Sequence, residues 1–229
     1  MKRATSVQGG RLAVALVVFG VVSLAYAGGH TWRVSEVFSN ADGTIQYVEV
    51  GEAFGGAPEI GTANHAVTSN TRSFVIPSNV TAPTSFRKIL IATPAFAALP
   101  GAPTPDYVLP AGAVPFFATT GDSVRYVPLD TFTFGAGLVP TDGVHSLNRD
   151  GVVGCNTPEN YAGDVGFVNL GCSLQGDVDG SGIVDGNDIA AFVRVLSGNP
   201  EPGDSPACAE YCQDSLSDTI LAFVSDLLS

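Results

Sequence analysis

A run of twelve residues near the C-terminus carries oxygen-bearing side chains at the spacing of a calcium-binding loop. Residues 177–188 read D-V-D-G-S-G-I-V-D-G-N-D, with carboxylates at loop positions 1, 3, 9 and 12 and a hydroxyl at position 5. A hard divalent cation takes six or more oxygen ligands, and a sharply turned loop offers them from alternating positions. The predicted ligands are the side chains of Asp177, Asp179, Ser181, Asp185 and Asp188 and the main-chain carbonyl of Ile183.

The same loop is electrostatically unfavourable without a cation. Four carboxylates within twelve residues repel one another, so we expect metal binding to supply much of the folding energy of this segment. The alternative is a solvated Asp/Gly turn, but the spacing constraints are met together and an apolar helix follows. This helix is predicted over 189–196, with a stripe of Ile189, Phe192, Val193 and Leu196. One Ca²⁺ ion is the predicted cofactor.

The first 27 residues have the features of a secretory signal. Three basic residues precede an apolar run over 12–26, and Ala25-Tyr26-Ala27 offers a small-residue cleavage site. A single membrane anchor is the alternative, but the run is slightly short for a span of about 20 residues. We therefore expect an exported chain, secreted or held in a bacterial cell envelope, without a membrane span after signal cleavage.

The charge of the chain is strongly acidic. Without the three signal cations, seven Lys and Arg residues face 22 Asp and Glu residues, a net charge of −15. Residues 173–229 alone hold ten acids and one base. Such a field repels nucleic acid and anionic lipid and attracts calcium, so nucleic acid is not an expected partner.

Four cysteines lie in the last third of the chain, at Cys155, Cys172, Cys208 and Cys212. An even count in an exported chain predicts disulfides. Of the three pairings we favour Cys155–Cys172 with Cys208–Cys212, because each then closes a loop within one region. A zinc site would need two close pairs of ligands, and the three histidines are scattered.

Short strands separated by Gly and Pro turns fill the region from residue 30 to about 172. The predicted strands are 32–38, 45–50, 72–76, 88–92, 107–109, 114–117, 123–127 and 131–134. The first two strands form a hairpin across Asp42-Gly43. The strand over 88–92 is predicted to be central in its sheet, and a short helical turn is predicted over 94–99. This pattern predicts a mainly β protein, a sandwich over 28–172, followed by a small helical domain over 173–229.

The stretch Gly176–Leu196 resembles one half of a bacterial type I dockerin, a family built from two halves that each have a calcium loop and one helix. The resemblance implies that the loop residues above bind calcium. It also implies that Gly186 and Asn187, at loop positions 10 and 11, select a cohesin-like protein partner. We expect Arg194, exposed on the helix that follows, to contribute to the same interface.

A second half of the same pattern is incomplete. Residues 217–227 look like the second helix, with a stripe of Ile220, Phe223, Val224 and Leu227, and Ala222-Phe-Val224 repeats Ala191-Phe-Val193. The preceding stretch 208–214 has lost the alternating carboxylates. We infer that a Cys208–Cys212 disulfide takes the place of a second calcium ion.

The N-terminal region resembles a bacterial lamin-tail-like domain. Residues 34–40 followed by 46–50 are similar to the opening hairpin of that family, and 73–103 and 156–163 also look like its exported members. The resemblance implies an immunoglobulin-like sandwich that acts as a binding or accessory module.

Motifs of common catalytic sites are absent from the sequence. There is no Gly-x-Ser-x-Gly elbow, His-Glu-x-x-His helix or phosphate-binding glycine loop. Glu36 and Glu49 face each other across the first hairpin, which suits glycoside cleavage only if they line a cleft. We predict a non-catalytic docking protein whose tail attaches the sandwich to a protein partner or the cell surface. The alternative is a polysaccharide-degrading enzyme or a carbohydrate-binding accessory module for a surface polysaccharide.

Overall fold

The computed structural model describes residues 28–213 and 215–229. The predicted signal segment, 1–27, lies outside these residues. No helix in the described ranges has the length and apolar character needed to cross a membrane.

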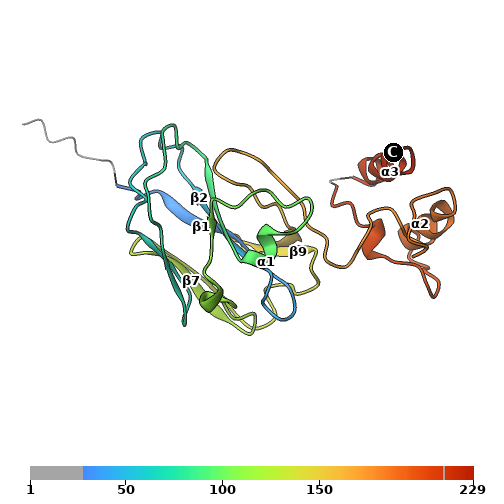
Figure 1. Ribbon diagram of the computed structural model, residues 1–229, viewed down its shortest axis with the longest axis horizontal. Helices are drawn as coiled ribbons and strands as arrows, with labels where there is room; N and C mark the ends of the chain where they lie inside the picture. The colour runs from blue at the N-terminus through green and yellow to red at the C-terminus, as the bar shows by residue number, and fades with distance from the viewer. Residues whose placement is uncertain (1–27, 214) are drawn as a thin grey trace, which may run out of the picture.

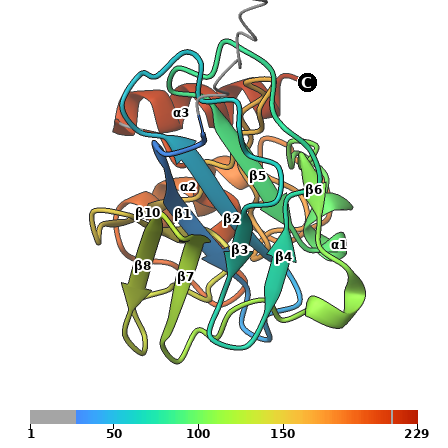
Figure 2. The same ribbon diagram turned by 90° about the vertical axis from the view of Figure 1, so that its left-hand side faces the viewer.

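The N-terminal part of the described chain is built around two β-sheets (Figures 1 and 2). Within the described residues, the larger sheet has the strand order β10-β9-β1-β2-β5-β6 and the smaller one β4-β3-β7-β8. The larger sheet consists of β1 Trp32–Ser39, β2 Gln46–Glu52, β5 Lys88–Ala92, β6 Tyr107–Val108, β9 His145–Asn148 and β10 Val153–Cys155. The smaller sheet consists of β3 Ala66–Thr68, β4 Ser73–Val75, β7 Asp122–Val127 and β8 Asp130–Phe134.

The predicted hairpin is confirmed. β1 and β2 pair antiparallel, with Glu36 opposite Glu49. Gly43 in the connecting turn has a φ of +73°, a left-handed conformation that glycine adopts readily. β2 also pairs with β5, which has β6 on its other side, so β5 is an interior strand as its apolar sequence predicted.

The main core lies between the two sheets, which confirms a mainly β fold with the layers of a sandwich. Alternating residues of β1, β2 and β5 meet those of β3, β7 and β8. The buried members from these strands are Trp32, Val34, Val37, Val48, Val50, Ile89, Ile91, Val67, Val124, Tyr126, Phe132 and Phe134. A second cluster covers the outer face of the larger sheet, where α1 (Pro94–Ala97) and Val168 pack on Phe38, Tyr47 and Leu90.

The expected strand over 114–117 is wrong, and three strands were not expected. Pro115 has no N–H group to donate to a ladder, and the Phe116 N–H donates instead to Gln46 Oε1 at 2.7 Å. β3, β9 and β10 were missed because they have only three or four residues each, too few for a periodic pattern.

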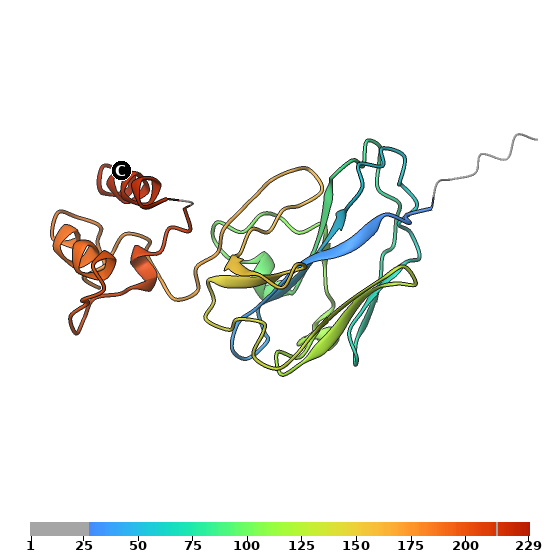
Figure 3. The ribbon, with the colours of Figure 1, turned by 180° about the vertical axis from the view of Figure 1, so that it is seen from behind.

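The C-terminal residues form two short helices beyond one end of the sheets (Figure 3). These are α2 (Asp188–Leu196) and α3 (Leu216–Leu227), with a 3₁₀ turn, η2, over Ala207–Ala209. Phe192 and Phe223, which occupy equivalent places in the predicted repeat, stack with ring centroids 3.8 Å apart and planes 10° apart. They centre a separate small core that also includes Val178 and Tyr211.

The predicted apolar stripes of the two helices are only partly correct. In α2 only Phe192 of the stripe is buried, whereas Ile189 is 49% and Val193 57% exposed. The helix turns its other face inward because Asp188 is fully buried; Ala191, Phe192 and Val195 then follow at i+3, i+4 and i+7. In α3, likewise, Phe223 and Leu227 face inward while Ile220 and Val224 are exposed.

The favoured cysteine pairings are also wrong. Cys155 bonds to Cys212 and Cys172 bonds to Cys208. The reason is that residues 205–213 fold back along 169–176, where the Gly176 N–H donates to the Cys208 carbonyl at 3.1 Å. The predicted Cys208–Cys212 disulfide, which was to take the place of a second calcium ion, therefore does not form. No free cysteine remains among the described residues, which leaves no thiolate for a zinc site there.

Candidate metal centre

The loop over 177–188 is curled by two left-handed glycines, Gly180 at a φ of +72° and Gly182 at +89°. The Gly182 N–H donates to Asp177 Oδ2 at 2.9 Å, and the Ser181 N–H donates to Asp179 Oδ1 at 3.0 Å. These hydrogen bonds turn the first two carboxylates toward the inside of the loop.

Asp188 joins the two ends of the loop. Its Oδ1 accepts the N–H groups of Val178 at 2.7 Å and Asp179 at 3.0 Å, and its Oδ2 accepts that of Asp185 at 2.9 Å. The side chain is fully buried at the start of α2. One carboxylate therefore fixes both the loop and the phase of the helix that follows.

Five of the six predicted ligand residues come together. Carboxylate oxygens of Asp177, Asp179 and Asp188 lie within 4.8 Å of one another. Ser181 Oγ lies 3.4 Å from Asp177 Oδ1 and donates to the Ile183 carbonyl at 3.2 Å. All these donors are hard oxygens, the set that suits Ca²⁺ or Mg²⁺ rather than zinc or copper.

Asp185, the sixth predicted ligand, is oriented differently. Its carboxylate accepts the N–H of Asn187 at 2.7 Å and the Nδ2 of Asn187 at 3.3 Å. It lies outside the group of three converging carboxylates. The contact instead shapes the turn that leads into α2.

The cluster of carboxylates has no basic neighbour in the described part of the chain. Arg194, the one base of residues 173–229, donates to Asp204 at 2.8 and 2.6 Å and lies 3.7 Å from Glu201. This hydrogen bonding from Arg194 lowers the pKa of Asp204 to about 2. Hydrogen bonds from Ser181 lower the pKa of Asp179. The converging carboxylates of the loop therefore have no basic side chain beside them in the described residues.

The predicted partner-binding residues lie around this loop. Gly186 and Asn187 are exposed on its rim, whereas the guanidinium group of Arg194 is already held by Asp204. Apolar side chains are also exposed on both helices. They are Ile189, Val193 and Leu196 of α2 and Leu216, Ile220, Leu221 and Val224 of α3.

Glu36 and Glu49 are opposite each other, but they form a buried network and not a cleft. Glu36 accepts hydrogen bonds from the Tyr47 hydroxyl and from the N–H and Oγ1 of Thr157. Glu49 accepts from Ser35 Oγ at 2.7 Å and the Glu159 N–H at 3.0 Å, and Lys88 Nζ lies 3.0 Å away. Both carboxylates are almost completely buried. Burial raises the pKa of Glu49 to about 7. The pair attaches residues 157–159 to the sheet.

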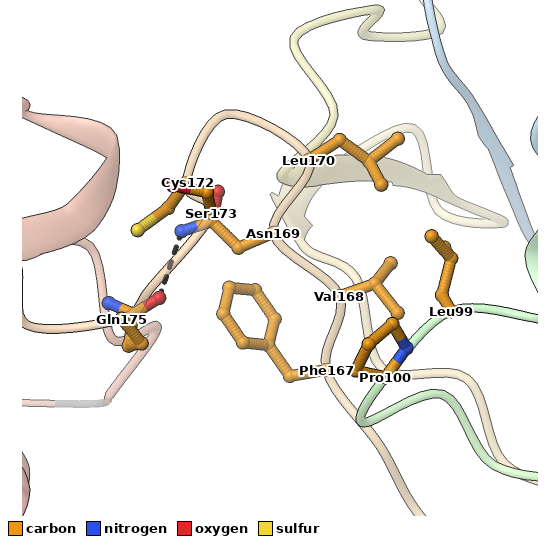
Figure 4. Close-up of a pocket in the computed structure, with 9 residues that line it drawn as sticks. All are labelled: Leu99, Pro100, Phe167, Val168, Asn169, Leu170, Cys172, Ser173 and Gln175. Atoms are coloured by element: carbon orange, nitrogen blue, oxygen red, sulfur yellow. Dashed lines mark hydrogen bonds between the residues drawn. The ribbon is translucent and has the colours of Figure 1, made fainter. Parts of the chain in front are cut away.

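Two hollows lie elsewhere on the described surface. One, of about 490 Å³, lies where the sandwich meets the tail, and no ionisable side chain lines it (Figure 4). There the Phe167 ring lies between Gln175 and Pro100. The other, of about 280 Å³, is lined by Ser78, Asn79, Val80, Thr81, Asp106, Tyr107 and Tyr161.

Sequence reasoning missed the amide groups that hold the tail to the sandwich. Asn169 Nδ2 donates to Gln175 Oε1 at 3.1 Å, the dashed line in Figure 4, and to the Ala207 carbonyl at 2.7 Å. Gln175 Nε2 in turn donates to the carbonyls of Cys208 and Glu210. Isolated amides carry no periodic signal, so only their position beside Cys172 at the expected boundary could have indicated this role.

Comparison with known proteins finds no relative of this chain. No protein-family model, curated protein or solved structure matches this chain.

Proposed function

We propose that the chain is an exported, non-catalytic docking protein whose dockerin-like tail is stabilised by one calcium ion. The observation that carries this proposal is the convergence of Asp177, Asp179 and Asp188, two of them buried, with no cation of the described chain to neutralise them. A bound Ca²⁺ supplies that neutralisation and links the loop to α2. Ser181 and the Ile183 carbonyl would complete the ligand set.

Docking uses the outward faces of the two tail helices. The exposed Ile189 and Val193 of α2 and Ile220 and Val224 of α3 form apolar surface in a segment that carries ten acids and one base. The complementary partner is a protein with an apolar patch bordered by Lys and Arg, such as a cohesin-like module. Gly186 and Asn187 at the loop rim leave backbone accessible to it.

Export is supported by the two disulfides together with the predicted signal segment. Disulfides form and persist in oxidising compartments. The sandwich, with its resemblance to lamin-tail-like modules, would be the part that the tail carries to the partner or to the cell surface.

Calorimetry with Ca²⁺ tests the metal site directly. We expect the exported protein to bind one Ca²⁺, and Asp188→Ala and Asp177→Ala to weaken binding by roughly tenfold or more. The matched control is Glu201→Gln, which removes an exposed tail carboxylate outside the loop and should leave the isotherm unchanged. Identical isotherms for Asp188→Ala and the unaltered chain would refute the ligand assignment.

Pull-down with immobilised cohesin modules tests docking. Capture in calcium that disappears with chelator supports the proposal, and Val193→Ser should reduce it. Calcium binding without any capture would mean that the tail only stabilises the C-terminus.

A carbohydrate-binding accessory role is the second candidate, favoured by the smaller hollow. Tyr107 and Tyr161 line it beside the carboxylate of Asp106 and the amide of Asn79, the mixture of rings and polar groups that sugars use. Affinity electrophoresis in polysaccharide gels, with Tyr107→Ala as the variant, tests this role.

A further inference from the structure

We propose that the smaller hollow binds a single amino-sugar residue, with the ammonium group of the sugar held by the carboxylate of Asp106. The hollow has a volume of about 280 Å³ and is lined by residues 78–81, 106–107 and 161. Small-molecule sites usually have volumes of about 300–1,000 Å³, so there is room for one sugar ring and not for an extended chain. The inference rests on the second candidate function, sugar binding at this hollow, and specifies which sugar.

The carboxylate of Asp106 has one oxygen left for a ligand. Its Oδ2 accepts the N–H groups of Leu90 at 2.8 Å and Tyr161 at 2.9 Å. Its Oδ1 accepts no hydrogen bond from another residue in the described ranges, and no base there forms an ion pair with it. Burial raises the pKa of Asp106 because partial withdrawal from water disfavours its charge. An ammonium group bound at Oδ1 would offset that cost.

The hydroxyl groups of the two lining tyrosines are already engaged by the protein. The Tyr161 hydroxyl donates to the Thr81 carbonyl. Tyr107 Oη lies 3.3 Å from Ser78 Oγ and 3.5 Å from the Ser78 carbonyl. The tyrosines therefore offer a ligand their ring faces and acceptor oxygens, and not a free hydroxyl hydrogen.

Both tyrosine rings are held by other aromatic rings of the sandwich. The ring centroids of Tyr161 and Trp32 are 6.5 Å apart, and those of Tyr107 and Phe74 are 5.8 Å apart. Trp32 belongs to the main core, and Phe74 packs against it. Rings fixed in this way provide a preformed apolar surface for the C–H face of a sugar.

The opposite wall supplies a hydrogen-bond donor and is also preformed. Asn79 Oδ1 accepts the Ala63 N–H at 2.9 Å, which orients the amide and leaves Nδ2 to donate to a sugar hydroxyl. Thr62 Oγ1 donates to the Ser78 carbonyl at 3.1 Å and accepts the Val80 N–H at 3.1 Å. The hollow thus combines a carboxylate acceptor, an amide donor and aromatic faces.

The charge around the hollow favours a cationic sugar. No Lys, Arg or His lines it, and Asp164 adds to the negative field at Asp106. Arg87 acts on Tyr161 from outside the hollow and donates to the Ala162 carbonyl at 3.3 Å. Uronic acids and sulfated sugars would therefore be repelled. A neutral sugar would form an ordinary hydrogen bond with Oδ1, whereas an ammonium group forms a stronger, charge-assisted one.

NMR titration of the exported protein at pH 6, where the amine of glucosamine is protonated, tests the proposal. The ligands are glucosamine, glucose and N-acetylglucosamine, which differ in one substituent. We expect glucosamine to bind about tenfold more tightly than either of the others. Asp106→Asn should lower glucosamine affinity about tenfold, to the level of glucose, because it removes the charge but keeps an oxygen for the N–H groups of Leu90 and Tyr161. The matched control is Asp150→Asn, at an exposed carboxylate outside the hollow, which should bind glucosamine like the wild type.

The outcomes separate this inference from the function on which it rests. Equal affinities for glucosamine and glucose would overturn the ammonium assignment and leave sugar binding intact. Equal affinities for glucosamine and butylamine, a primary amine without a sugar ring, would overturn the sugar assignment and with it the second candidate function. Wild-type affinity in a folded Asp106→Asn variant would refute the role of this carboxylate. If that variant folds poorly, the ligand series on the unaltered protein still decides, and binding of none of the ligands would overturn both proposals.

Discussion

The Cys172–Cys208 disulfide should set the calcium affinity of the tail. It joins residues 36 apart in sequence, and the ring that it closes contains the whole loop 177–188 and α2. Cys208 also contacts the start of the loop, because its carbonyl accepts the Gly176 N–H at 3.1 Å. Removing this bond with Cys172→Ser and Cys208→Ser therefore frees the segment that calcium must order.

The size of the effect follows from loop closure. Closing a ring of this length lowers the conformational entropy of the unfolded chain and so raises its free energy by about 4 kcal/mol at 25 °C. If calcium binding and folding of the tail are coupled, removing the disulfide lowers the calcium affinity of the variant by the same free energy. The upper bound is a loss of roughly a thousandfold. The Cys155–Cys212 bond still limits the unfolded chain, so we expect a loss of about tenfold to a hundredfold.

The assay is calcium calorimetry on two double variants. Cys155→Ser with Cys212→Ser is the control, because it releases the tail from β10 but leaves the inner ring closed. We expect this control to stay within about threefold of the unaltered chain. Equal calcium affinities for the two double variants would refute the coupling between the inner ring and the metal site.

Three further perturbations have defined outcomes. The pKa of Glu49 is raised from 4.5 to about 7 in the fold, so the folded state holds a proton that the unfolded state has lost, and stability should fall by about 3 kcal/mol as pH rises between these values. Thermal melts at pH 5 and pH 8 check this, and Glu49→Gln should remove the difference. Phe192→Ala should destabilise the calcium-bound tail by about 3–5 kcal/mol, because it removes the ring stacked 3.8 Å from Phe223; an unchanged melt of the tail would contradict the stacking role. Gly29→Val should cost about 1–3 kcal/mol, since a Cβ there would lie 3.0 Å from Trp32 Cδ1 and Tyr126 Oη, whereas Gly112→Ala, with open space around it, should melt like the wild type.

Local features of the sequence predicted the local features of the fold. The β1–β2 hairpin follows from alternating residues on either side of Asp42-Gly43, and β5 matches its predicted bounds, Lys88–Ala92. Three of the four loop carboxylates converge because the spacing of glycines and carboxylates fixes a tight turn within twelve residues. In each case the interactions that decide the structure lie within a few residues.

Features that depend on distant contacts could not be predicted. The inward face of α2 was mistaken because hydropathy favours Ile189 and Val193, whereas the buried carboxylate of Asp188 decides the orientation. The cysteine pairing was mistaken because the contact between Gly176 and Cys208 appears only after the chain folds back. Glu52, whose carboxylate accepts hydrogen bonds from the N–H groups of Phe54, Gly55 and Phe86, looks like any strand-end acid in the sequence.

The nested disulfides have a consequence for proteolysis. Because Cys172 is bonded to Cys208 and Cys155 to Cys212, a single cut anywhere between residues 172 and 208 leaves both fragments covalently joined. The nicked protein would migrate as one band on a non-reducing gel and separate only when reduced. A single cut after Cys212 would instead release α3 and take Phe223 out of the small core, so the short connection to α3 is the point at which one protease event removes part of the tail.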